Sequence, residues 1–142
     1  MIVLRIKRLI AACLYYSGLL WLYTAWALRG RTLVLMYHRV LTPEERARTF
    51  SHPGIVVDET AFDRQLAFLK KHFRLLSGAE FMRRLRGGDG DRRPACLITF
   101  DDGWADNHSR ALPLLAKHGT PALVFLATGL IGSDEGLRRE RL

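Results

Sequence analysis

Residues 97–104 read LITFDDGW, an apolar run that stops at two adjacent carboxylates and a glycine. The apolar run begins at Ala95, and a second apolar run spans residues 122–127 after a stretch with helical spacing. Strand, acidic turn, helix and strand in this order predict a βαβ unit with parallel strands. The expected fold class is therefore α/β.

Asp101 and Asp102 lie where the first of these strands ends. In parallel α/β folds, ligands bind beyond the carboxyl ends of the strands. Two adjacent carboxylates repel each other, so a bound cation or a raised pKa on one of them is expected. Gly103 allows the backbone to turn tightly beside the bound group. The turn is the candidate functional site.

The segment Thr99-Phe100-Asp101-Asp102-Gly103 resembles the first motif of the polysaccharide deacetylases, the NodB-homology domain of carbohydrate esterase family four. A bare Asp-Asp-Gly would be weak evidence, but further blocks follow in family order. The resemblance covers roughly residues 33–132 and includes LMYHRV at 35–40, DN at 106–107, ALPLL at 111–115 and PALVF at 121–125.

The resemblance implies a partial (β/α) barrel of the deacetylase type over residues 31–142. It also implies hydrolysis of N-acetyl groups on a cell-envelope or extracellular polysaccharide with the help of a divalent metal, zinc in a full-length form. Asp101 would then be the catalytic base and Asp102 a metal ligand. This division is chemically reasonable, because a metal-bound carboxylate stays ionised while its neighbour stays free to accept a proton.

The second motif of the family, His-Ser/Thr-x-x-His, has no counterpart in this sequence. We therefore expect the amino-terminal part of a deacetylase, inactive and a poor binder of transition metals by itself. Two alternatives stay open. One is a non-catalytic, membrane-anchored remnant or binding module. The other is an acidic pocket for phosphoryl transfer, which is disfavoured because the sequence has no Gly-rich phosphate loop.

The net charge of +8 comes mainly from the amino-terminal end. Residues 1–31 hold five basic and no acidic side chains, whereas the other 111 residues hold 17 basic and 14 acidic ones. Basic residues that flank one apolar segment indicate a membrane partner rather than nucleic acid. Cys13 and Cys96 lie in different environments, and their pattern indicates neither a disulfide nor a metal site.

Residues 9–28 contain no charge and are long enough to cross about 30 Å of hydrocarbon. Together with the basic tail at residues 1–8, they predict a single-pass anchor with a cytoplasmic amino terminus and an extracytoplasmic domain. A cleaved signal peptide is the alternative, because residues 25–27, Ala-Trp-Ala, fit a small-x-small cleavage site. A buried core helix is disfavoured because the segment has no polar face.

Several helices are expected around the strands. Thr60 and Asp63 approximate a capping box for an amphipathic helix, and Ser77 and Glu80 open a second helix that reaches about Leu85. Residues 41–55 and 86–94 are expected to be loops. After the acidic turn, Asp106 or Asn107 is expected to cap a helix whose regular part runs from Pro113 to His118 and stops at Gly119.

His38 ends the apolar run 33–37, which has the pattern of a buried strand. Its ordinary interpretation is a polar residue at the point where a strand leaves the core. Its functional interpretation is a side chain at the rim of the site, since strand ends meet there. The other four histidines are expected to be surface residues rather than metal ligands.

Overall fold

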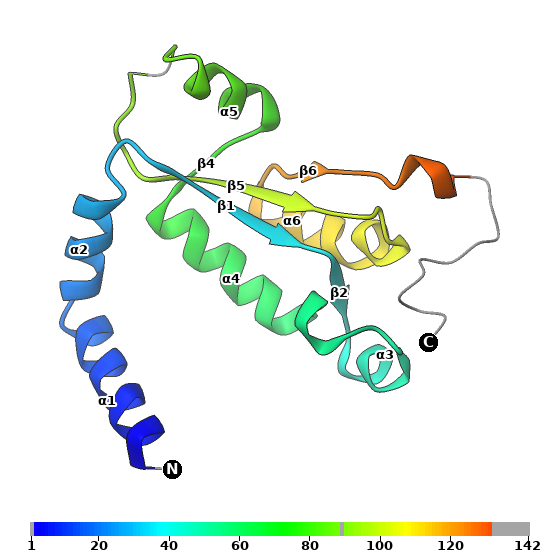
Figure 1. The fold of residues 1–142 in the computed structure, drawn as a ribbon, viewed down its shortest axis with the longest axis horizontal. Coiled ribbons are helices and arrows are strands. Elements are labelled where there is room, and N and C mark those ends of the chain that lie inside the picture. The colour runs from blue at the N-terminus through cyan, green and yellow to red at the C-terminus, as the bar shows by residue number, and fades with distance from the viewer. Residues whose placement is uncertain (1, 89, 132–142) are drawn as a thin grey trace.

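The computed structural model describes residues 2–88 and 90–131 of the 142-residue chain. One open parallel sheet carries helices on one face, and a bent pair of helices extends from its amino-terminal end (Figure 1). The helices are α1 (Ile2–Tyr16), α2 (Leu19–Ala27), α3 (Pro43–Arg48), α4 (Glu59–His72), α5 (Gly78–Leu85) and α6 (Leu112–His118). The strands are β1 (Thr32–Tyr37), β2 (Arg39–Leu41), β3 (Val56–Asp58), β4 (Arg74–Leu75), β5 (Ala95–Phe100) and β6 (Leu123–Val124).

Strand β5 is the centre of the main sheet. It pairs with β1 along its whole length, with β4 at its amino-terminal end and with β6 at its carboxyl end, always in parallel. A second small sheet joins β2 to β3, also in parallel. The expected α/β class with parallel strands is confirmed. Within the described residues the sheet is open, and no strand closes it into a barrel.

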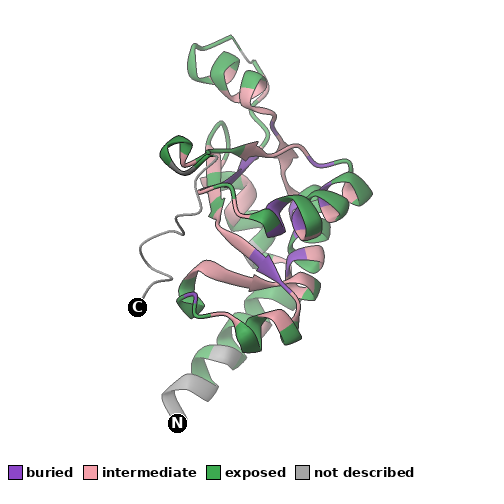
Figure 2. Ribbon diagram, turned by 90° about the vertical axis from the view of Figure 1, so that its right-hand side faces the viewer, coloured by how far each residue is buried: buried purple, intermediate pink, exposed green. Residues whose placement is uncertain are grey.

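The hydrophobic core lies between the sheet and helices α4 and α6. All six residues of β5 are buried. Figure 2 shows that buried stretches lie among partly buried ones in the interior, whereas the outer helices and loops are largely exposed. The α4 side chains Phe62, Leu66 and Leu69 pack against this face. Residues 62, 66 and 69 recur at helical spacing, which is why the sequence identifies them as one apolar face.

The apolar run 33–37 predicted a buried strand, and β1 differs from this prediction. Its residues alternate between partly buried and exposed, and Val34 and Met36 expose 52% and 61% of their surface. Leu33 and Leu35 point to the covered side and pack on the core. The apolar run was therefore correctly identified as a strand, but only one of its faces is covered in the described structure.

Helix boundaries follow their caps. The Ser77–Glu80 capping box at α5 is confirmed, and so is the stop of α6 at Gly119, which has φ of 59°. The predicted box of Thr60 and Asp63 is wrong, because Asp58 accepts hydrogen bonds from the backbone N–H groups of residues 60 and 61 and α4 begins earlier. The predicted loop 41–55 contains helix α3, with its own capping box.

The apolar amino-terminal segment is divided into α1 and α2 rather than forming one continuous helix. Gly18 separates them with φ of 74°, a left-handed conformation that glycine adopts without a Cβ penalty. No single helix in the described chain is long and apolar enough to cross a membrane. The two arms Leu9–Tyr16 and Trp21–Ala27 meet the length and composition requirements only together, with a bend of 78° between them.

The remaining expected segments agree with the structure in part. The second apolar run, 122–127, forms only the two-residue strand β6 before the chain becomes irregular. The carboxyl-terminal part of the expected domain, residues 132–142, lies outside the described residues.

The two cysteines are expected to differ in reactivity. Cys96 is 0% exposed in β5, and burial raises its pKa to about 11, so at pH 8 it stays a protonated and inaccessible thiol. Cys13 is exposed. Iodoacetamide at pH 8 should therefore alkylate Cys13 alone in the folded protein and both cysteines in denaturant, as measured by mass spectrometry. Cys13→Ser is the control and should leave no reactive thiol before unfolding. Alkylation of Cys96 in the folded protein at the rate of Cys13 would contradict its placement.

Candidate functional site

The acidic turn follows the last residue of β5 and is held from both sides. The backbone N–H of Asp101 donates to the carbonyl oxygen of Tyr37 at 2.9 Å, which extends the pairing with β1. The backbone N–H of Phe125 donates to the carbonyl oxygen of Phe100 at 2.8 Å, which extends the pairing with β6. The position of the carboxylates is therefore determined by the sheet and not by a mobile loop.

Both residues after Asp101 adopt a left-handed backbone. Asp102 has φ of 72° and Gly103 has φ of 71°, and Asp102 is the only non-glycine residue among the described ones with positive φ. Aspartate tolerates this region better than most residues. At Gly103 a Cβ atom would lie 2.5 Å from Cδ2 of Leu126, so a larger residue would strain the backbone and displace that side chain. The glycine expected at a tight turn is confirmed.

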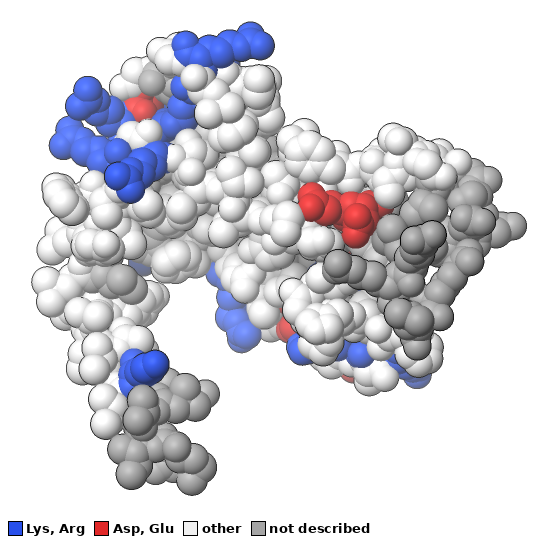
Figure 3. Space-filling model, viewed as in Figure 1, with Lys and Arg blue, Asp and Glu red and all other residues white. Residues whose placement is uncertain are grey.

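Asp101 and Asp102 line an open groove of about 730 Å³. Apart from Thr99, the other residues that line this groove are apolar or glycine. They come from β1, α5, β5, β6 and the segment after β6: Val34, Met36, Gly78, Phe81, Met82, Leu97, Leu123, Phe125, Leu126 and Ala127. Figure 3 shows acidic side chains at the molecular surface near the carboxyl end of β5. The arrangement is a hydrophobic groove with two carboxylates at one end.

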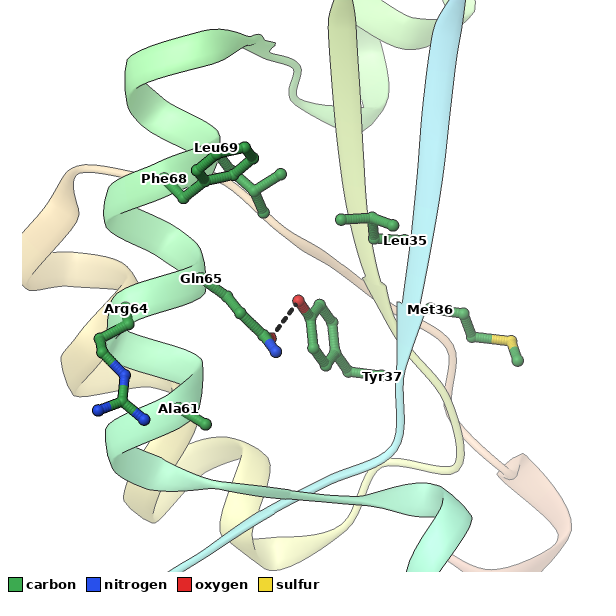
Figure 4. Close-up of a pocket in the computed structure, with 8 residues that line it drawn as sticks. All are labelled: Leu35, Met36, Tyr37, Ala61, Arg64, Gln65, Phe68 and Leu69. Carbon is green, nitrogen blue, oxygen red and sulfur yellow. Dashed lines mark hydrogen bonds between the residues drawn. The ribbon is translucent and has the colours of Figure 1, made fainter. Parts of the chain in front are cut away.

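A second groove of about 640 Å³ lies between β1 and α4 (Figure 4). The Tyr37 hydroxyl points into it and donates to Oε1 of Gln65 at 2.9 Å. Burial, with a smaller contribution from Cys96, raises the pKa of Tyr37 to about 12, so this phenol stays protonated at neutral pH. Among the described residues that line this groove there is no carboxylate. The groove beside Asp101 is therefore the better candidate for chemistry.

His38 lies at the same edge as the acidic turn. Tyr37 pairs in register with Phe100, so His38 and Asp101 are the next residues along two adjacent strands. The backbone carbonyl of His38 accepts a hydrogen bond from Nδ2 of Asn107 at 2.7 Å. His38 therefore lies at the carboxyl end of the strand beside β5, but it is not among the described residues that line the groove with Asp101 and Asp102.

The other histidines lie elsewhere. Nε2 of His118 is 2.8 Å from the Asp63 carboxylate, whose pKa is lowered by hydrogen bonds from Lys117 and then His118. His52 accepts from the backbone N–H of Gly54, and the ring of His72 lies 4.5 Å from that of Phe68, tilted by 41°. The part of the chain that the structure describes contains no group of three or more His, Cys, Asp or Glu side chains able to hold a metal ion. These residues alone therefore do not fit a zinc site of the usual kind.

A buried ion pair holds the segment that follows the turn. Nε of Arg39 donates to Oδ2 of Asp106 at 2.9 Å, and the backbone N–H of Val40 donates to Oδ1 at 2.9 Å. The two side chains are only 15% and 8% exposed. Asp106 was expected to cap a helix, but its side chain makes no cap bond. Its hydrogen bonds instead join the start of the helical segment to β2.

The sequence did not reveal this pair, because its members are 67 residues apart. Arg39 also donates to the hydroxyls of Thr49 and Ser51, at 3.1 and 2.8 Å, and its guanidinium lies 4.2 Å from the centre of the Trp104 ring. Asp106 directly precedes the π-helical turn η2 (Asn107–Ala111), a form that often occurs near functional sites. The polar segment around Ser51 offered no signal beyond its loop composition.

Asp106→Ala should lower the free energy of unfolding by about 3 kcal/mol, because it leaves the buried Arg39 charge and the Val40 N–H without their acceptor. Equilibrium urea unfolding followed by tryptophan fluorescence measures this change. Glu44→Ala, at an exposed position of α3, is the control and should cost less than about 1 kcal/mol. Similar small losses in both variants would show that the ion pair does not hold the segment.

Comparison with known proteins gives one consistent result. A family model described as polysaccharide deacetylase matches residues 88–141. The chain is 28% identical over 110 residues to YxkH of Bacillus subtilis (strain 168), which carries the name of a polysaccharide deacetylase. The match covers 77% of this chain and 36% of YxkH.

Two solved structures resemble the described fold. The Streptococcus pyogenes deacetylase PplD, solved in complex with acetate, matches with a TM-score of 0.60 and 32% identity over 75% of this chain and 47% of that one. IcaB from Ammonifex degensii matches with a TM-score of 0.62 and 28% identity over 73% of this chain and 41% of that one. This chain spans less than half the length of each of these relatives. The family model, YxkH and PplD are all deacetylases by name, and the chain is therefore similar to part of a polysaccharide deacetylase.

Proposed function

We propose that this protein acts in the hydrolysis of N-acetyl groups on a cell-envelope or extracellular polysaccharide. One observation carries the proposal. The acidic pair of the family motif lies at the carboxyl end of the central strand, beside a groove, in a fold similar to those of deacetylases. The apolar groove wall, which includes Met36 and Phe125, suits the apolar face of a sugar ring and an acetyl methyl group.

In this proposal Asp101 is the base that takes a proton from the attacking water. Its backbone is held by the Tyr37 carbonyl, so its carboxylate is positioned by the sheet. Asp102 is a ligand to a divalent metal, for which zinc is the candidate. Such a metal would supply Lewis-acid assistance at the acetamide carbonyl. Because the described residues contain no three-donor cluster, further donors would have to join Asp102 before zinc is held in the usual way.

The membrane is part of the same proposal. The apolar arms of α1 and α2 have the combined length and composition of a span, although they are bent. Trp21, Tyr23 and Trp26 are exposed, as side chains that contact an interface are. We propose a membrane-associated protein with its deacetylase part on the extracytoplasmic side, where N-acetylated polysaccharide is found.

A second candidate function is a non-catalytic, membrane-anchored module. The observation that favours it is the small number of metal donors. The described chain has two adjacent carboxylates at this site and no group of three or more His, Cys, Asp or Glu side chains that could hold a metal ion. Such a module could still bind a polysaccharide in the groove without cleaving it. Acetate release separates the two functions.

The function is tested by measuring acetate released from N-acetylated chitooligosaccharides, for this chain alone and for a polypeptide that continues it with the remaining part of the family domain. In the longer polypeptide, Asp101→Asn should keep metal binding and lower turnover by about 100-fold or more, because it removes the base but keeps the shape. Asp102→Ala should lose metal and activity together. Equal metal loss in both variants would contradict the assigned roles, and an inactive longer polypeptide would favour the non-catalytic module.

The 142-residue chain by itself should bind zinc weakly, with a dissociation constant above about 1 μM. Catalytic zinc sites use about three protein ligands, and two neighbouring carboxylates supply at most two. Isothermal titration calorimetry with zinc chloride measures the affinity. Tighter one-to-one binding that disappears in Asp102→Ala would reveal a ligand that the described residues do not show.

A further inference from the structure

Arginines gather at the end of the sheet opposite the acidic turn. Arg31 directly precedes β1, Arg92 and Arg93 come just before β5, and Arg74 is the first residue of β4. The three strands are parallel, so their amino-terminal ends lie together at one edge of the sheet. The same topology places Asp101 and Asp102 at the far edge. Each end of the sheet thus carries charges of one predominant sign.

Hydrogen bonds join the segments that carry these arginines. The backbone N–H of Gly30 donates to the carbonyl of Arg92 at 2.8 Å. The guanidinium of Arg84 in α5 donates to the carbonyls of Asp91 and Arg93, at 2.9 and 3.1 Å. The loops before β1 and β5 and helix α5 therefore form one surface. We call it the arginine end, which consists of Arg29, Arg31, Arg74, Arg83, Arg84, Arg86, Arg92 and Arg93.

The arginine end keeps an excess of positive charge. Residues 29–31 and 74–94 contain eight arginines and three acidic residues, a net charge of +5 out of +8 for the whole chain. Glu80 pairs with Arg74, and Asp91 pairs with both Arg74 and Arg93. Six of the arginines are exposed: Arg29, Arg31, Arg83, Arg86, Arg92 and Arg93. In Figure 3 basic side chains cluster around α5 and the neighbouring loops, with little acidic surface among them.

An apolar surface continues from the arginine end. Helix α2 ends at Ala27, two residues before Arg29, and exposes Trp21, Leu22 and Trp26 by 53%, 57% and 78%. Aromatic and aliphatic side chains next to a basic patch match the acyl boundary and the headgroups of an anionic bilayer. A soluble polyanion would account for the arginines but not for the apolar surface beside them.

We propose that the arginine end docks onto anionic lipid headgroups while the apolar helices enter the bilayer, an inference that rests on the membrane association proposed above. The consequence is an orientation of the protein. Strand β5 has six residues at about 3.3 Å per residue, so the acidic turn lies about 20 Å farther from the lipid surface than the arginine end. The groove beside Asp101 then faces away from the bilayer, towards a polymer outside the membrane.

The test is flotation of the full chain with vesicles of phosphatidylcholine alone or with 30% phosphatidylglycerol. The anionic vesicles should bind it at least about tenfold more strongly at 0.1 M salt, because each basic side chain near the surface adds to the attraction. The ratio should fall towards one at 0.5 M salt. The triple variant Arg83→Gln, Arg86→Gln, Arg92→Gln should lose most of this preference.

The control is Arg46→Gln, Arg48→Gln, Arg64→Gln, which removes the same charge from exposed arginines of α3 and α4. This variant should keep the preference for anionic vesicles. Equal binding to both vesicles, or equal losses in the two triple variants, would overturn the docking surface and leave the membrane association intact. Flotation with neither vesicle would overturn both. Heparin binding that needs Arg83, Arg86 and Arg92, without any lipid preference, would assign the surface to a soluble polyanion instead.

Discussion

The hydrogen bonds that β5 makes with strands on both sides support every other feature of the candidate site. They begin at Ala95, run the length of β5 beside β1, and continue past the last strand residue to the N–H of Asp101. Because β5 is buried throughout, these bonds are shielded from water and the strand cannot shift its register without exposing apolar side chains. The position of the acidic turn is therefore set by β5, all six residues of which are buried.

The turn also depends on what lies after it. Asp102 and Gly103 reverse the chain with positive φ angles, and Asp106 then binds Arg39 and the backbone of Val40. A buried ion pair of this kind contributes little when compared with an apolar pair of similar shape, but losing one partner is costly. It joins the segment after β5 to the segment after β1, which are the two strand ends that border the groove.

Parallel topology also separates the charges of the molecule. In the main sheet β1, β4 and β5 start at one end, and β1 and β5 finish at the other, so a few arginines before these strands and two aspartates after β5 produce opposite poles. The amino-terminal helices join the basic pole, and the groove opens at the acidic one. When the basic pole binds a surface, the groove at the acidic pole therefore faces away from that surface. This orientation follows from the parallel sheet, in which basic residues precede strands and acidic residues follow β5.

The sequence by itself determined the local elements and the residues of the turn. Apolar runs at 33–37 and 95–100, helical spacing at Phe62, Leu66 and Leu69, and the Ser77–Glu80 capping box are encoded within a few residues, so their structures could be predicted. The motif around Asp101 likewise indicated the resemblance to polysaccharide deacetylases, because its residues are contiguous.

Only the tertiary structure decided what depends on distant segments. The ion pair of Arg39 with Asp106 joins positions far apart in the chain, and so does the gathering of Arg31, Arg84 and Arg92 at one end of the sheet. The exposure of one face of β1 likewise depends on which distant segments pack against that strand. The break at Gly18 is a local exception, since an apolar composition without a polar face gave no reason to divide the helix there. Long-range partners are selected by packing and by the satisfaction of buried polar groups, and neither has a fixed spacing in sequence.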